Sequence, residues 1–179
     1  MLYFITGNKN KFRELKEIIP GLTMLEIDLD EIQSLDPQII IEHKLREAIK
    51  KKGGEFIIED TSLYLDGLNG FPGPLIKWML ETIGNKGIYE IAKSFNNFGV
   101  TAKTVIGHAD HTGKISCFEG SLKGNIVKPR GKTNFGWDTI FEPKGYKKTM
   151  AEMSLAEKNK ISMRRNAATK LNDFLKGGK

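Results

Sequence analysis

The chain has 179 residues, of which 39% are hydrophobic and 28% charged, as in an ordinary globular protein. At this length one domain, or two lobes that share one core, can bury enough surface to fold without cross-links, so we predict a single domain over residues 1–179. The single cysteine excludes an intrachain disulfide. The formal net charge of +6 favours anionic partners, either nucleotides or nucleic acid.

Two further classes of protein are disfavoured. No stretch approaches the ~20 apolar residues of a membrane span, and the apolar run at residues 1–5 is too short for a signal peptide. The histidines at 43, 108 and 111 lack the spacing of a zinc site, and Cys117 stands outside any nucleophile motif. We therefore expect a soluble, cytoplasmic protein with no membrane partner and with neither zinc nor thiol chemistry.

Strands and helices are expected to mix along the whole chain. Runs of β-favouring apolar residues predict strands at 2–6, 25–29, 56–58, 101–108, 115–122 and 139–141. Apolar residues at helical spacing predict helices at 12–19, 37–52, 75–83 and 88–95, and one more near the C-terminus. Asp36 and Pro37 suit the N-cap and first residue of the second helix, and Ser154 and Glu157 have capping-box spacing. This mixture, with a hairpin over residues 110–113, predicts an α/β fold with a mixed, twisted β-sheet and flanking helices.

The segment Thr6-Gly7-Asn8-Lys9-Asn10-Lys11 lies at the predicted junction of the first strand and the first helix. Glycine allows a ligand to approach the backbone, the lysines supply positive charge, and the helix N-terminus adds unsatisfied N–H groups. The segment therefore suits phosphate binding, although it is not a Walker A loop. Taken alone, it could also be an ordinary polar turn.

Two acidic segments follow predicted strands. Glu59 and Asp60 follow the strand at 56–58, near the edge where α/β sheets bind ligands, and can hold Mg²⁺ or orient a water. Adjacent strand residues point to opposite faces, so only one of the pair need face the site, and we expect it to be Asp60. The acidic cluster Asp28-Leu29-Asp30-Glu31, after the strand predicted at 25–29, could supply a second metal ligand. Helix caps or solvated turns are the alternatives for both segments.

Two later segments suit the remainder of a nucleotide. In Phe135-Gly136-Trp137-Asp138, a ring could stack on a flat base while the carboxylate accepts from a ring N–H. Around residues 156–165, Lys158 and Arg164 could reach a phosphate or a base carbonyl. Core aromatics and an amphipathic helix with a charged outer face are the respective alternatives.

Taken together, these motifs resemble the inosine triphosphatase family, whose members remove non-standard purine nucleoside triphosphates. The motifs are TGNKNK at 6–11, EDTSL at 59–63, GLNGFPGPLIKW at 67–78, PRG at 129–131, FGWD at 135–138 and AEKN at 156–159. The resemblance covers nearly the whole chain. It implies two lobes around a central nucleotide-binding cleft, and hydrolysis of ITP, dITP or XTP to the monophosphate and pyrophosphate. It also implies a Mg²⁺ cofactor, a homodimer and no stable nucleic-acid complex.

The resemblance also implies roles for individual residues. Asp60 and Lys11 would be catalytic, and Glu31 and Asp60 would bind the metal. The implied substrate-binding residues are Thr6, Gly7, Asn8, Lys9, Asn10, Lys11, Lys44, Asp60, Thr61, Lys77, Phe135, Gly136, Trp137, Asp138, Lys158, Met163 and Arg164. We further expect Arg164 and backbone N–H groups to donate to O6 of the purine. Whether Glu59 joins the metal site is left open.

One residue departs from the family pattern. The family usually has Ser-His-Arg where this chain has Ser162-Met163-Arg164, and the histidine lies at the nucleobase. Methionine can neither donate to O6 nor titrate, and Met163 shares a helical stripe with Ala167 and Leu171, so it could instead be core. The ranking of purine substrates is therefore open. The alternatives are a Maf-like pyrophosphatase with another base preference and a non-catalytic nucleic-acid-binding module.

Overall fold

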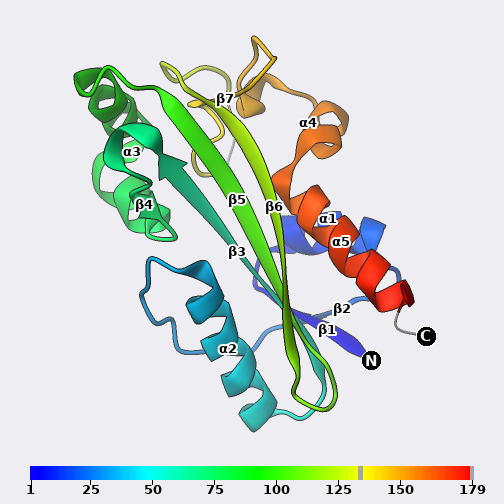
Figure 1. The fold of residues 1–179 in the computed structure, drawn as a ribbon. Helices are drawn as coiled ribbons and strands as arrows, with labels where there is room; N and C mark the ends of the chain where they lie inside the picture. The colour runs from blue at the N-terminus through cyan, green and yellow to red at the C-terminus, as the bar shows by residue number, and fades with distance from the viewer. Residues whose placement is uncertain (133–134, 178–179) are drawn as a thin grey trace. The chain divides into compact units, whose positions relative to one another are not determined.

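The structure, a computed structural model, describes residues 1–132 and 135–177 (Figure 1). Its strands are β1 (Leu2–Ile5), β2 (Thr23–Leu25), β3 (Glu55–Leu65), β4 (Pro72–Gly73), β5 (Gly99–Ala109), β6 (Ile115–Ile126) and β7 (Phe141–Pro143). Its helices are α1 (Lys9–Ile18), α2 (Pro37–Lys51), α3 (Ile76–Ser94), α4 (Leu155–Ile161) and α5 (Met163–Gly177). Two short 3-10 helices, η1 (Asp66–Leu68) and η2 (Met150–Glu152), complete the described elements.

The strands form one mixed sheet in the order β2-β1-β3-β5-β6-β7, with β4 paired to β3 off this path. β1 runs parallel to β2 and β3, whereas β4 and β7 pair antiparallel with β3 and β6. This arrangement confirms the predicted α/β class. None of the described helices is long and apolar enough to cross a membrane.

The chain forms two compact units. Unit 1 comprises Met1–Thr61, Thr104–Gly120 and Met163–Lys179, and unit 2 comprises Ser62–Lys103 and Ser121–Ser162. β3, β5 and β6 each contribute residues to both units. Each unit has buried apolar side chains of its own.

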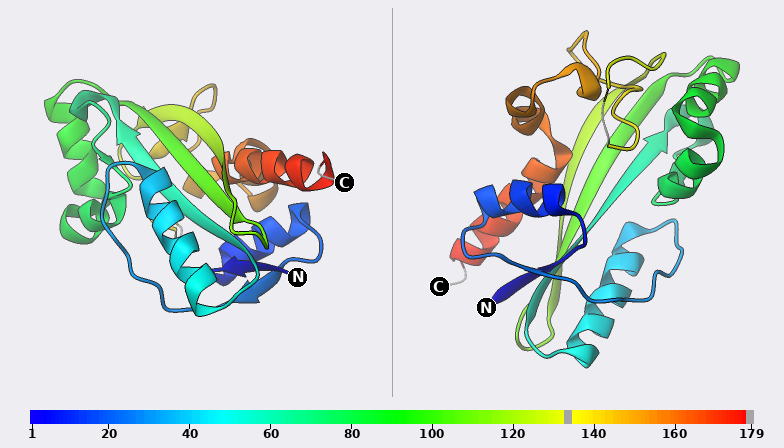
Figure 2. Two further views of the ribbon diagram at one scale, coloured as in Figure 1. Left: turned by 60° about the horizontal axis from the view of Figure 1, so that its bottom comes forward. Right: turned by 180° about the vertical axis from the view of Figure 1, so that it is seen from behind.

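Unit 1 has a core on each face of its strands. Figure 2 shows α2 on one face and α1 with α5 on the other. Phe56 and Ile58 of β3 pack with the apolar side of α2, whereas Ile57 packs with α1 and α5. Because successive strand residues alternate between faces, Asp60 is on the α2 face and Glu59 on the α1/α5 face.

Two glycines allow these helices to approach the sheet closely. A Cβ at Gly107 would lie 2.1 Å from Ile41 Cγ2 of α2, and a Cβ at Gly120 would lie 2.0 Å from the backbone oxygen of Met163 in α5. Side chains at either position would therefore displace a helix.

Unit 2 is built around α3, with the segments that follow β6 completing it. Buried side chains from α3, from β7 and from the 135–141 segment form its core, among them Ile76, Ile88, Trp137 and Phe141. Gly84 has φ of 65° and ψ of 179°, so α3 is two helices joined across a kink. The two helices predicted at 75–83 and 88–95 are confirmed, but the second resumes directly after Gly84.

Several predicted boundaries were wrong. β2 ends at Leu25 rather than Leu29, and β7 begins at Phe141 instead of ending there. β3 continues to Leu65, so Glu59 and Asp60 lie in mid-strand and not at its end. The polar side chains of this strand interrupt its apolar run, which made the strand look shorter.

Helix ends were decided by capping. α1 begins at Lys9 and not at residue 12, because the Asn8 side chain caps it. The helix predicted near the C-terminus is two helices, α4 and α5, which part at Ser162. The capping box of Ser154 and Glu157 and the N-cap role of Asp36 are both confirmed.

Candidate active site

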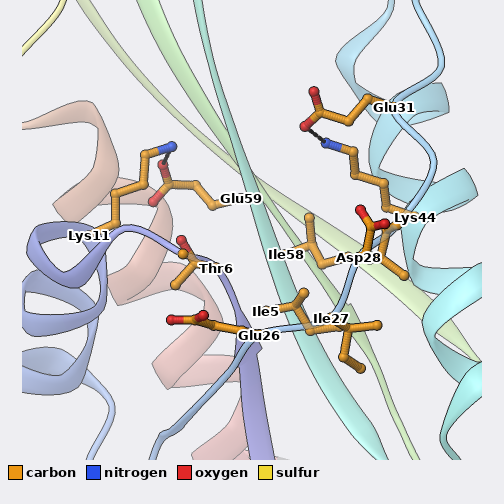
Figure 3. A pocket seen from close by; sticks show the side chains of 12 residues that line it. Ile5, Thr6, Lys11, Glu26, Ile27, Asp28, Glu31, Lys44, Ile58 and Glu59 are labelled. Carbon is orange, nitrogen blue, oxygen red and sulfur yellow. Dashed lines mark hydrogen bonds and ion pairs between the residues drawn. The ribbon is translucent and has the colours of Figure 1, made fainter.

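A pocket of about 640 Å³ opens in unit 1 at the carboxyl ends of β1 and β2. Its charged lining residues are Lys11, Glu26, Asp28, Glu31, Lys44 and Glu59, and Thr6 and Gly7 also contribute. Figure 3 shows Lys11 with Glu59 on one side of the pocket and Lys44 with Glu31 on the other. The structure thus brings two of the predicted phosphate lysines, Lys11 and Lys44, and the predicted metal glutamate to one cavity.

The phosphate segment is partly loop and partly helix. The Asn8 side-chain oxygen accepts from the backbone N of Asn10 and Lys11, at 3.0 and 3.1 Å, and Thr6 Oγ1 accepts from the backbone N of Asn8 at 3.1 Å. Lys9, Asn10 and Lys11 are therefore the first turn of α1, a correction to the predicted loop. A helix N-terminus beside a pocket is a favourable place for an anion.

A buried ionic network surrounds Glu59. Its side chain is fully buried, and Lys11 Nζ lies 3.0 Å from its Oε1. Arg164 donates from Nε to Oε2 at 2.7 Å and from Nη2 to Oε1 at 3.2 Å, and Thr61 Oγ1 donates to Oε1 at 3.1 Å. Burial would raise the pKa of Glu59, but the charges of Arg164 and Lys11 outweigh it and hold the pKa at about 2.

This network also settles how Arg164 is oriented. Its Nη1 donates to Glu14 Oε2 at 2.5 Å, so Nε, Nη1 and Nη2 all point at carboxylates of α1 and β3. Burial would lower the pKa of Arg164, but the Glu59 charge raises it, so the guanidinium stays charged. In this structure Arg164 holds Glu59, and the expected donation to a purine O6 is replaced by carboxylate contacts.

The second ion pair lies on the α2 side of the pocket. Lys44 Nζ is 2.8 Å from Glu31 Oε1, and this carboxylate is 59% exposed. The segment that carries Glu31 is tied to α2, since Glu47 accepts from the backbone N of Asp30 and Lys51 donates to the backbone oxygen of Asp28, both at 2.7 Å. These contacts keep Glu31 within reach of Lys44.

The donor set fits Mg²⁺ only with substrate present. Glu31 lines the pocket, and Asp60 is on the α2 face of β3. Asp60 does not appear among the described residues that line the pocket, and no group of three or more His, Cys, Asp or Glu in the described chain could hold a metal. Mg²⁺ usually takes one or two carboxylates and completes its shell with water and phosphate oxygens. Glu31 and Asp60 are therefore ligands of the right chemical type. Glu59 is committed to Lys11 and Arg164 and so does not suit a metal ligand.

The predicted base segment belongs to unit 2. Trp137 is 3% exposed and packs on Phe141 at 5.3 Å between ring centroids, so this ring is core. Phe135 is the more accessible ring, and Lys158 Nζ lies 4.7 Å from its centroid. Asp138 is buried and forms an ion pair with Lys158. Its expected contact with a base N–H therefore stays a prediction.

The remaining predicted residues are divided between the units. Lys77, in unit 2, is exposed, and its ammonium lies 5.4 Å from the ring centroid of the neighbouring Trp78. Met163, in unit 1, is 2% exposed at the start of α5, so of its two interpretations the structure supports core. Asn8, Lys9 and Asn10 are absent from the described lining of the unit 1 pocket.

Two residues with a clear role were missed from the sequence. Glu14, the second partner of Arg164, lies three residues after Lys11 on α1, a helical spacing that could have indicated a shared face. Asn85 donates to the Gly136 backbone oxygen at 2.9 Å and to Thr139 Oγ1 at 3.0 Å, and so braces the 135–139 segment. No local signal in the sequence pairs residues 51 positions apart.

Comparison with known proteins finds a family match and several relatives of similar length. The sequence model of the Ham1 family matches residues 2–174. The inosine triphosphate pyrophosphatase of Kluyveromyces lactis is 40% identical over 97% of this chain and 95% of that protein. The protein of the same name from Schizosaccharomyces pombe is 39% identical over 99% and 96%.

Solved structures share the fold. The Ham1 protein of Staphylococcus aureus is similar with a TM-score of 0.80 and 26% identity over 99% of both chains. A HAM1 protein from Coxiella burnetii gives a TM-score of 0.85 over 98% of both chains, and at 23% identity it bears on the fold alone.

Proposed function

The chain belongs to the Ham1 family, and we propose that it is a Mg²⁺-dependent pyrophosphohydrolase of non-standard purine nucleoside triphosphates such as ITP, dITP and XTP. The observation that carries the proposal is the unit 1 pocket, which combines two lysines, a helix N-terminus and the carboxylate of Glu31. The names of the relatives, at about 40% identity over nearly the full length, point to the same reaction.

The carboxylates that line the pocket outnumber its two lysines, so the pocket suits a triphosphate only together with a metal cation. A triphosphate carries about four negative charges near neutral pH, and they must be neutralised before water can attack phosphorus. Lys11 and Lys44 supply fixed positive charge in the pocket, and the family resemblance assigns substrate binding to Lys77 as well. Mg²⁺, when bound, supplies Lewis-acid polarisation of the phosphoryl oxygens, and Glu31 and Asp60 would hold it.

We assign activation of the attacking water to Asp60. Its carboxylate orients the nucleophile and accepts its proton as the oxygen–phosphorus bond forms and the α–β anhydride bond breaks, which gives the monophosphate and pyrophosphate. General-base catalysis of this kind contributes about 10²–10⁴-fold in rate. Glu59 positions Lys11, and Arg164 holds Glu59 in place.

Base selection is assigned to unit 2. Phe135 offers a ring for stacking, and Lys158 beside it offers a donor to a purine carbonyl. Hypoxanthine and xanthine present O6 as an acceptor where adenine presents an amino group, and a donor left unpaired rejects the wrong base by up to ~10⁴–10⁵-fold.

A substrate panel tests the proposal. ITP, dITP, XTP, GTP, ATP and UTP are incubated with Mg²⁺ or EDTA, and pyrophosphate and monophosphate are measured. We expect both products from ITP, dITP and XTP with Mg²⁺ only. Preference for UTP or for a standard purine triphosphate would favour the Maf-like alternative. Salt-sensitive binding to DNA without product would favour the nucleic-acid module.

The assembly and compartment are also proposals. The family resemblance leads us to propose a homodimer in the cytoplasm. Light scattering on the purified chain tests the dimer, and a mass of one 20.1 kDa chain would contradict it.

A further inference from the structure

The two lysines that line the unit 1 pocket have carboxylate partners of opposite character. Lys11 pairs with Glu59, whose side chain is fully buried. Lys44 pairs with Glu31, whose side chain is 59% exposed. Figure 3 shows the two pairs on different sides of the same pocket. An incoming triphosphate therefore meets two cations that are already neutralised.

Of these two ion pairs, only Lys44–Glu31 can separate so that each residue takes a new partner. Glu59 is held by Arg164 and Thr61 in addition to Lys11, and moving it would leave Arg164 buried without that carboxylate. Glu31 lies outside the helices and strands, and water can solvate its carboxylate once it leaves Lys44. Lys44 is 18% exposed, but an ion pair with one carboxylate in contact with water contributes little stability, so the pair opens at small cost.

We propose that Glu31 and Lys44 exchange partners when substrate binds: Glu31 leaves Lys44 to ligate the metal, and Lys44 turns its ammonium to a phosphate oxygen. The inference rests on the proposed function for the identity of the ligands. A triphosphate that arrives without metal must break the pair and then face the released Glu31 charge. Glu31 thus couples the two binding events, and each ligand strengthens binding of the other to the same extent.

Calorimetric binding of inorganic triphosphate, which carries no base, tests the exchange. The titration is made in EDTA and again with Mg²⁺ on the wild type, on Glu31→Gln and on Asp28→Asn. Asp28 lines the same pocket, and the contact it makes with Lys51 uses its backbone oxygen, so this control removes an equal charge and leaves Lys44 paired. In EDTA we expect Glu31→Gln to bind about two- to five-fold more tightly than Asp28→Asn, in line with an exposed pair. Glu31→Gln should also lose most of the gain that Mg²⁺ brings to the wild type.

A double-mutant cycle separates release of Lys44 from a general change in the field. In a Lys44→Met background the gain of Glu31→Gln over Asp28→Asn should vanish, because no ammonium remains to be released and only the loss of one negative charge is left in both variants. A gain that persists there would overturn the exchange, as would equal affinities of Glu31→Gln and Asp28→Asn, or no metal-free binding to either. A chain that hydrolyses ITP but shows no such gain would refute the exchange and leave the proposed function standing.

Discussion

At the residue scale, Glu59 and Asp60 are neighbours with different tasks, because strand geometry sends them to opposite faces. Asp60 is on the α2 face, where Glu31 and Lys44 line the pocket. We predict that Asp60→Asn lowers kcat for ITP by about 10²–10⁴-fold, the loss of a general base, while the thermal midpoint stays within about 2 °C. Steady-state kinetics and calorimetry measure the two quantities. Near-normal turnover would remove Asp60 from the reaction.

Glu59 should behave in the opposite way. Glu59→Gln removes one of the two carboxylates that pair with Arg164, and the more deeply buried one, so we predict a loss of about 3–5 kcal/mol in the free energy of unfolding, the usual effect of breaking a buried ion pair. Urea denaturation followed by circular dichroism measures it, with Asp60→Asn as the matched control from the next position. Equal stability of the two variants would contradict the buried network.

Lys11 is the residue of α1 to which we assign phosphate binding. Lys11→Ala should raise KM for ITP by about 10- to 100-fold, the effect of losing a charge-assisted hydrogen bond. Lys16→Ala is the matched control, since it removes the same charge from the last turn of the same helix, where the ammonium lies over Phe12. If both variants keep the wild-type KM, α1 does not contact the triphosphate.

At the scale of elements, the contact between α5 and β6 depends on Gly120. A Cβ there would lie 2.0 Å from Met163 O and 2.6 Å from Ala167 N, and backbone atoms cannot rotate away. We predict that Gly120→Ala lowers the free energy of unfolding by about 1–3 kcal/mol, as overpacking does. A Cβ at Gly53 would meet nothing within 4 Å, so Gly53→Ala should change the free energy of unfolding by less than about 0.5 kcal/mol. Chemical denaturation of both variants measures the difference, and equal stabilities would refute the close packing.

At the scale of the whole molecule, the buried network makes stability depend on pH. The pKa of Glu59 is lowered from 4.5 to about 2, so its contribution is complete above pH 4.5 and is lost as pH falls toward 2. The shift corresponds to ~3 kcal/mol. Asp110 and Glu157 also have pKa values of about 2, and they titrate in any variant that keeps them. Stability curves of wild type and Glu59→Gln should therefore converge below pH 4, and parallel curves would contradict the prediction.

Much of the local structure could be predicted from the sequence. The Asp36 cap, the Ser154–Glu157 capping box, the turn at 110–113 and the break at Gly84 depend on a few adjacent residues, so they were identified directly. Boundaries were missed where neighbours from elsewhere in the chain determine the end of an element. β3 is an example, since its polar residues remain in the strand because β5 pairs with it.

What the sequence by itself determined is the α/β class, the family and the residue types of the phosphate site, because these depend on local pattern and on motif order. Only the tertiary structure decided the partners of the charges. Arg164 meets Glu59 across 105 positions and Glu14 across 150, and Glu31 meets Lys44 only once its loop is tied to α2. It also showed that Met163 is buried. The physical reason is that an ion pair or a core contact depends on which faces pack together, and no local pattern specifies that.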